Sequence, residues 1–406
     1  MATPYYKVLM TTRERKDEYG TIIDITQDVE LTEYIKSNGI STMKIEADEG
    51  DYTVGVFAIG SLKLKAVNQD GRFCDETNWR SLFPYSRDLS KIDVVYVDRN
   101  GTEYTRFKGL IVEDATKENL LTNEVEFTVQ NQQGILRKTN IFPGTVRAGM
   151  TFKEAMTGIL DRPPITDILN FDENDINPQL NLTIDVADFF FGISVYKGVN
   201  ALLQASNSIL IIDGSNNIIV RSREANSNTP YEFFNGNDYY GRENIIKFAK
   251  YNTGLQRAFN TVKVNDFTYI DDAAVEIKGA RQKSISLDFI TDRKKCLTIA
   301  KAIVDEFKVP KYEMELTVLT EYVKDIQMFD LCSVDFEKRI ASYKGADVPL
   351  YDHAEYDFAK YPSEFGNISI PPEMGFKVTA IREVPSNKTT QLRLRQIGIT
   401  NGDGFL

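Results

Sequence analysis

Short runs of alternating apolar and polar residues, separated by turn signals, recur along this chain and limit most strongly how it can fold. The run 91–98 alternates in this way, and Asn100-Gly101, the dipeptide typical of a two-residue hairpin turn, follows it directly. Strands of the same kind are predicted at 102–112, 123–130 and 376–396. Closely spaced strands joined by such turns predict a small antiparallel barrel or sandwich.

Two of these hairpins resemble each other, one near each end of the chain. The first joins 107–113 to 124–130, and the second joins 376–383 to 391–396. Both have similar lengths and close a β-rich segment. The pattern indicates a duplicated barrel, although two unrelated alternating hairpins would look much the same.

The stretch 284–334 reads as strand, helix, strand and strand. Residues 284–289 alternate. Thr291 then supplies an N-cap, and Asp292 an acid in the first turn, for a helix predicted over 291–308. The apolar face of this helix consists of Cys296, Ile299, Ala300, Ile303, Val304 and Phe307. Strands are predicted again at 312–319 and 329–334, so the helix is expected to lie across a β-structure.

The middle of the chain has a different pattern. Thr151 and Glu154 have the spacing of a capping box, and Ser194 can cap a second helix. A hairpin is predicted at 209–223. The first 40 residues are mostly polar, and strands are expected from Thr42 onward. The fold class predicted is mainly β with α/β insertions. It comprises a first β-barrel domain (1–143), a middle α/β module (144–243) and a second β-barrel domain (244–406) with a long loop at 338–374.

Composition excludes several classes of function. The 406 residues carry a net charge of -11, which argues against a protein that grips nucleic acid or an anionic membrane. No window is apolar enough to predict a membrane segment, and residues 1–10 show no secretory signal. Three cysteines, far apart in sequence, fit reduced structural thiols.

The search for chemistry assigns no catalytic, cofactor-binding or metal-binding residue. The single histidine, His353, allows no histidine cluster. Asp172, Asn174 and Asp175 resemble a calcium loop, but Ile176 stands where a ligand is needed. Two carboxylate pairs, Glu313 with Glu315 and Asp271 with Asp272, keep a hydrolase possible in principle.

Aromatic residues mark one candidate interaction loop within 338–374. They alternate with acidic residues and are Tyr351, Tyr356, Phe358, Tyr361 and Phe365. The alternative is an aromatic flap folded onto its own barrel. For Phe189-Phe190-Phe191, core packing is favoured over an exposed anchor.

In the order of their predicted elements and in their residue patterns, residues 40 to 400 resemble the baseplate hub (tail hub) proteins of phage tails and the hub part of contractile injection systems. The β-segment closed by 107–130 comes first, and the helices and hairpin of 150–160 and 195–223 resemble the family's middle module. The strand 259–264 then resembles the opening of a second barrel. In 328–334, Phe329 replaces the glycine of the family's usual Gly-Asp pair.

The resemblance implies two tail-tube-like barrels per subunit and a homotrimer whose six barrels join a sixfold tube to a threefold tip. The implied partners are the tail tube protein or distal tail protein ring, a tip or spike protein and the tape measure protein. DNA would pass through the lumen without specific binding, and the protein would belong to the virion. No cofactor and no enzymatic activity are expected. Two other classes stay open: a host-surface glycan-binding tail protein and a cell-wall hydrolase that uses paired carboxylates.

Overall fold

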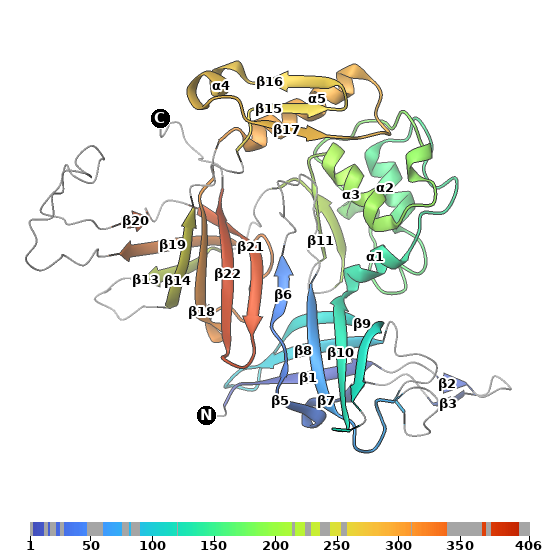
Figure 1. Cartoon of the computed structure of the whole chain (residues 1–406), viewed down its shortest axis with the longest axis vertical. Helices are drawn as coiled ribbons and strands as arrows, with labels where there is room; N and C mark the ends of the chain where they lie inside the picture. The colour runs from blue at the N-terminus through green and yellow to red at the C-terminus, as the bar shows by residue number, and fades with distance from the viewer. Residues whose placement is uncertain are drawn as a thin grey trace, which may run out of the picture.

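The computed structural model describes residues 3–11, 15–16, 22–24, 28–46, 60–74, 81–82, 90–119, 121–212, 216–223, 229–235, 244–252, 258–309, 311–338, 368–370 and 375–397. Four parts can be followed in Figure 1. A first β region lies at the bottom and a second β region at the left. A helical middle module lies at the right, and a small upper layer of strands and helices covers the top.

The first β region is built from antiparallel strands in the order β7-β10-β9-β8-β1-β4, with β5 also paired to β7. The elements are β1 (Tyr5–Thr11), β2 (Arg15–Lys16), β3 (Ile22–Asp24), β4 (Asp28–Glu30), η1 (Thr32–Tyr34), β5 (Ile35–Ile40), β7 (Ser61–Val67), β8 (Lys91–Val97), β9 (Glu103–Asn119) and β10 (Glu124–Asn131). In β7 and β10 every second side chain is buried, as the period-two pattern predicts.

The predicted hairpin at Asn100-Gly101 is confirmed. Val97 pairs with Glu103 across the turn, and Gly101 has a φ of +82°. That left-handed backbone favours glycine because a Cβ atom would clash with the preceding backbone. The Asp98 carboxylate accepts the backbone N–H groups of Asn100 and Thr102 at 2.8 and 2.9 Å, which fixes the turn.

The prediction that strands begin only at Thr42 is wrong. Strand β1 pairs with β8 along its whole length, and Tyr6, Val8 and Met10 are buried on one face. These residues alternate with Lys7 and Leu9 in the sequence. The signal for a strand was therefore present, within a segment whose average polarity concealed it.

The second β region has the strand order β14-β18-β22-β21, and β21 also pairs with β19. Its elements are β13 (Tyr231–Asn235), β14 (Ile245–Asn252), β18 (Glu313–Leu319), η7 (Thr320–Tyr322), β19 (Leu331–Lys338), β20 (Ile368–Ile370), β21 (Gly375–Val384) and β22 (Thr389–Gln396). Met314, Leu316 and Val318, alternate residues of the strand predicted at 312–319, are buried. Strand β20, which pairs with β19, lies inside the stretch predicted to be a loop at 338–374.

The fold class, mainly β with α/β insertions, is confirmed, but the strand ladders of the described residues form no closed barrel. Strand β6 (Met43–Glu46) pairs with a strand of each β region and so links both into one 15-stranded sheet. In the second region β13 pairs in parallel with β19. Among the described residues, the open ends of that region meet at Asn244, whose N–H donates to the Phe234 carbonyl at 3.2 Å.

The middle module consists of short helices around a hairpin: η3 (Gln132–Gly134), α1 (Ile135–Lys138), α2 (Phe152–Leu160), η4 (Glu173–Asp175), η5 (Asp188–Phe190), α3 (Val195–Ala205), β11 (Ile209–Ile212) and β12 (Ile218–Arg221). The capping box is confirmed: the Thr151 N–H donates to Glu154 Oε2 at 2.7 Å, and the Glu154 N–H donates to Thr151 Oγ1 at 3.2 Å. Ser194 caps α3 as predicted.

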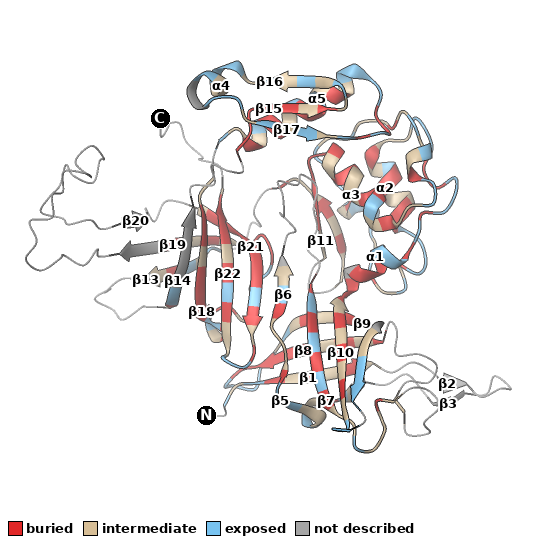
Figure 2. Ribbon diagram, viewed as in Figure 1, coloured by how far each residue is buried: buried red, intermediate tan, exposed pale blue. Residues whose placement is uncertain are grey.

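The upper layer contains β15 (Thr261–Val264), β16 (Phe267–Ile270), α4 (Asp272–Lys278), β17 (Gln282–Ile285) and α5 (Arg293–Phe307). Asp292 caps α5 by accepting the Lys295 N–H at 3.0 Å. All six residues of the predicted apolar face of α5 are buried. Figure 2 shows this pattern of buried residues inside the layer and exposed residues on its outside.

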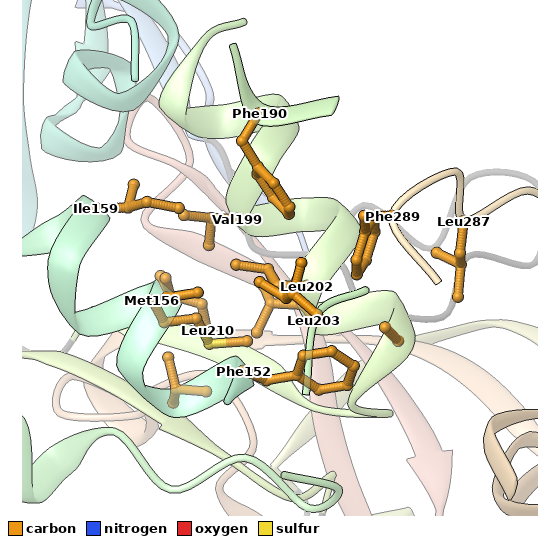
Figure 3. Close-up of a cluster of buried hydrophobic side chains, with 14 of the residues drawn as sticks. Phe152, Met156, Ile159, Phe190, Val199, Leu202, Leu203, Leu210, Leu287 and Phe289 are labelled. Carbon is orange, nitrogen blue, oxygen red and sulfur yellow. The ribbon is translucent and has the colours of Figure 1, made fainter. Parts of the chain in front are cut away.

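The apolar face of α5 packs into the same hydrophobic core as helices α2 and α3. Figure 3 shows Phe289, from the connection between β17 and α5, among the side chains of the middle module. Its ring centroid lies 5.1 Å from that of Phe190 and 6.2 Å from that of Phe152. The domain limits at 143/144 and 243/244 stay predictions. Helix α5 belongs to the predicted domain 244–406 but shares its hydrophobic core with the predicted module 144–243.

Candidate functional site: the junction of the two β regions

The junction is the place where the first and second β regions meet. Within the described residues, strand β6 pairs with β21 at four positions, from Met43–Glu383 to Glu46–Ala380, and with β7 at the single position Lys44–Ser61. The two regions also have separate hydrophobic cores. Backbone pairing alone therefore connects them narrowly, and side chains supply the remaining contacts.

A buried ion pair crosses the junction. Arg106 of β9 donates from Nε to Glu383 Oε2 of β21 at 2.7 Å, and the two side chains are 4% and 3% exposed. A second nitrogen of Arg106 donates to the Lys324 carbonyl at 2.6 Å. The hydroxyl of Tyr6 donates to the other Glu383 oxygen at 2.5 Å. Burial, together with the charge of Glu383, raises the pKa of Tyr6 well above its usual range.

A second, more accessible set of contacts lies beside this pair. Lys324 donates from Nζ to Asp98 Oδ2 at 2.8 Å and stands 4.6 Å from the centroid of the Tyr104 ring. The hydrogen bond with Asp98 raises the pKa of Lys324, and the same bond lowers the pKa of Asp98. The hydroxyl of Tyr96 donates to Glu321. Each contact joins the first β region to the segment between β18 and β19.

A cavity of about 420 Å³ lies beside these contacts. The first and second β regions and the middle module all contribute to its wall, which includes Arg106, Phe107, Gln132, Ile212, Met328 and Phe329. Phe329 has a φ of +67°, in the left-handed region that favours glycine, and its N–H donates to the Val378 carbonyl at 2.8 Å. Phe329, which stands where the sequence resemblance expects a glycine, therefore has a backbone conformation that favours glycine.

A further polar cluster joins the upper layer to the second β region. The guanidinium groups of Arg223 and Arg395 lie 5.4 and 5.3 Å from the centroid of the Phe307 ring. Lys377 donates to the Arg223 carbonyl. Lys311 donates to Glu306 at 2.6 Å, and burial lowers the pKa of Lys311 despite that pairing. The end of α5 is thus held by Arg223, which follows β12 of the middle module, and by Lys311 and Arg395 of the second region.

The residues predicted as sites take different places. The aromatic loop residues Tyr351, Tyr356, Phe358, Tyr361 and Phe365, and also His353, lie outside the described residues. Phe190 is buried, as core packing predicts, whereas Phe191 is 69% exposed. Asp172 caps the 3-10 helix η4 by accepting the Asn174 N–H at 2.8 Å.

The carboxylate pairs have structural partners. Glu315 accepts hydrogen bonds from Arg393 at 3.2 Å, and Glu313 lies 3.9 Å from Arg395. Asp271 caps α4 and pairs with Lys308 at 3.1 Å. Within the described residues, no group of histidine, cysteine, aspartate and glutamate side chains could hold a metal ion. The described helices include none with the length and apolar composition needed to cross a membrane.

Sequence patterns did not indicate the junction. Arg106 and Glu383 are 277 positions apart and lie in ordinary alternating strands.

Comparison with known proteins places the whole chain among phage tail folds. No family model matches the sequence, and no curated protein matches it. Solved structures do match, and two crystal structures are among them: a tail protein from Neisseria meningitidis, at 13% identity and a TM-score of 0.57, and the 43 kDa tail protein of prophage MuSo2 from Shewanella oneidensis, at 10% identity and a TM-score of 0.51. The first match covers 97% of this chain and 98% of the other, and the second covers 96% and 97%.

Because both matches span nearly the full length of each chain, the chain as a whole has the fold of these tail proteins. The resemblance drawn from the sequence is confirmed at the level of the fold.

Proposed function

We propose that this protein is a structural component of a phage-type tail, located in the virion at the tail tip or baseplate. Its subunits form a homotrimeric hub that joins the sixfold tail tube to the threefold tip or spike and lines the channel for DNA. The observation that carries the proposal is the full-length likeness to two tail proteins. A hub needs two β regions held at a defined orientation, and the buried contacts of the junction supply such a connection.

Electrostatics support the role in DNA passage. The net charge of -11 disfavours lasting contact with a phosphate backbone, so DNA could slide through the ring without specific binding. The proposed partners are the tail tube protein or a distal tail protein ring, the tip or spike protein and the tape measure protein. The role needs no catalysis, and the arginine partners of Glu313 and Glu315 support a structural use of those carboxylates.

The test is the solution mass. Light scattering over a concentration series, with negative-stain images of the same sample, should give particles near three times 46.1 kDa with a central hole. Rings that form only after the tail tube protein is added would also support the hub and show templated assembly. A monomer at every concentration, with and without the tube protein, would overturn the proposal.

A further inference from the structure

The outer face of helix α5 carries a group of basic side chains for which the described residues of the subunit provide no ion pair. Arg293, Lys294 and Lys301 are exposed, and none of them forms an ion pair within the described part of the chain. Their neighbour Lys295 is used differently, since its ammonium group binds Asp185 and the Thr183 carbonyl of the middle module. The three exposed residues are called the basic face below.

The basic face is unfavourable for the helix itself. The N-terminus of a helix carries partial positive charge, so cations in the first turn are disfavoured and acids are favoured. Helices α2 and α4 follow this rule with Glu154 and Asp272 in their first turns. Helix α5 has no acid in its first turn, which Arg293 and Lys294 occupy. Helix stability therefore does not explain the placement of these charges.

The middle module carries the complementary charge. Residues 154–188 contain eight acidic residues and one basic residue. Asp161, Asp167, Asp172 and Glu173 are exposed, and these four form no ion pair within the described residues. They are called the acidic segment below. The basic face belongs to the upper layer and the acidic segment to the helical module beside it, two different parts of the molecule in Figure 1.

Two complementary surfaces at different places on one chain suit a head-to-tail contact. In a ring, each subunit offers one surface to the subunit ahead and the other to the subunit behind. We propose that the basic face of α5 docks on the acidic segment of a second copy of this chain, and that this contact closes the ring. The inference rests on the proposed hub function, because a head-to-tail contact can also build an open filament and the hub is what requires a closed ring.

A nucleic acid is the less favoured partner for the basic face. Three cations on a chain with a net charge of -11 provide few phosphate contacts, whereas the acidic segment offers matched charges at high local density. Charge pairing of this kind mainly fixes the register and orientation of the partners.

The experiment is a charge swap under the conditions in which the wild-type protein forms rings, alone or with tube protein. The variant Arg293→Glu/Lys294→Glu/Lys301→Glu should shift the mass from ring to monomer and raise the concentration for half-assembly at least tenfold. The variant Asp161→Lys/Asp167→Lys/Glu173→Lys should do the same, and it leaves the Asp172 cap intact. A chain that carries all six substitutions presents swapped but matched charges, so its rings should return.

A matched control carries the same change in net charge at other exposed cations, Arg99→Glu/Lys117→Glu/Lys197→Glu, and should assemble like the wild type. Circular dichroism and thermal melts establish that each variant is folded, and recovery by the sixfold variant excludes misfolding as the cause of the loss. If both charge-reversal variants form rings as the wild-type protein does, this inference is overturned and the hub proposal stands.

Three other results would also overturn the inference. One is failure of the sixfold variant to recover rings. Another is a loss confined to the binding of a fluorescent DNA duplex while rings persist, which would make DNA the partner of α5. The third is absence of wild-type rings under all conditions, which would remove the hub proposal as well.

Discussion

Two contacts between parts of this chain are built in opposite ways. The upper layer meets the middle module mainly through hydrocarbon, with Phe289 inserted among Phe152, Phe189 and Phe190, while Lys295 and Asp185 add polar contacts. The first β region meets the second through the buried pair Arg106–Glu383, its accessory hydrogen bonds and an adjacent cavity. Both contacts hold the same protein together, but their energies depend on different features.

The apolar contact distributes its energy over many side chains and specifies orientation only loosely, because burial of hydrocarbon has no direction. The junction concentrates its energy in a few groups whose hydrogen bonds have direction. A buried ion pair adds little net stability, but removing one partner leaves a buried charge uncompensated. The junction therefore gives the contact between the two β regions a direction that apolar burial alone does not supply.

The largest expected effect is at the apolar contact. Phe289→Ala should lower the free energy of unfolding by about 3–5 kcal/mol, since it removes a fully buried ring and leaves a cavity. Chemical denaturation followed by circular dichroism measures the change. Phe191→Ala is the matched control, because its side chain is 69% exposed and the expected change is within about 0.5 kcal/mol. Equal effects of the two substitutions would contradict the packing described for Phe289.

At the junction, Arg106→Leu should lower the free energy of unfolding by about 3 kcal/mol, near the low end for a broken buried pair. The low end is expected because Tyr6 still donates to Glu383 in the variant. The double variant Arg106→Leu/Glu383→Leu should recover part of the loss, since it removes the stranded carboxylate. A double-mutant cycle by denaturation measures the coupling, and strict additivity of the two changes would show that the pair does not act as a unit.

Phe329 is an apolar residue at the polar junction. Its left-handed backbone destabilises the folded protein, whereas burial of its ring stabilises it. A glycine would relieve about 1–2 kcal/mol of left-handed strain, but loss of the buried ring costs about 3–5 kcal/mol. Phe329→Gly should therefore destabilise the protein by about 2 kcal/mol.

The control for the strain is Gly101→Ala, at a φ of +82° with no atom near the added Cβ. This change should cost about 1 kcal/mol through backbone strain alone. A more stable Phe329→Gly protein would show that strain outweighs packing at this position.

Local patterns predicted the elements well where one face of an element is buried. The alternating strands around Asn100-Gly101 and the six-residue face of α5 were predicted because a single period determines each of them. The capping box of α2 was predicted for a related reason, since its hydrogen bonds span only three residues. The cap of α5 was predicted one residue too early, at Thr291, whereas Asp292 is the residue that accepts the Lys295 N–H.

The sequence did not predict how these elements associate. Assignment of α5 to the core of α2 and α3, rather than to the second β region, depends on contacts between distant segments. The link through β6 and the pairing of Arg106 with Glu383 likewise bring together residues hundreds of positions apart. Strand β1 was missed because polarity was averaged over 40 residues, while its burial pattern extends over seven.

The smallest expected effect concerns the accessible contact of the junction, and it appears as a dependence on pH. The pKa of Asp98 is lower in the folded protein, so its contribution to stability is present above its unfolded pKa of about 3.9 and is lost as pH falls through the folded pKa. Asp98→Asn keeps an oxygen acceptor for the Asn100 and Thr102 N–H groups but removes the charge opposite Lys324. The wild-type protein should thus exceed the variant in stability by a constant margin near neutral pH, and the margin should shrink below about pH 4. Urea denaturation at several pH values measures the margin. The margin of the wild-type protein over Lys324→Met should shrink in the same pH range, because that variant removes the other partner of the pair. A margin that persists unchanged down to pH 2 would show that the margin does not come from the ionised carboxylate of Asp98.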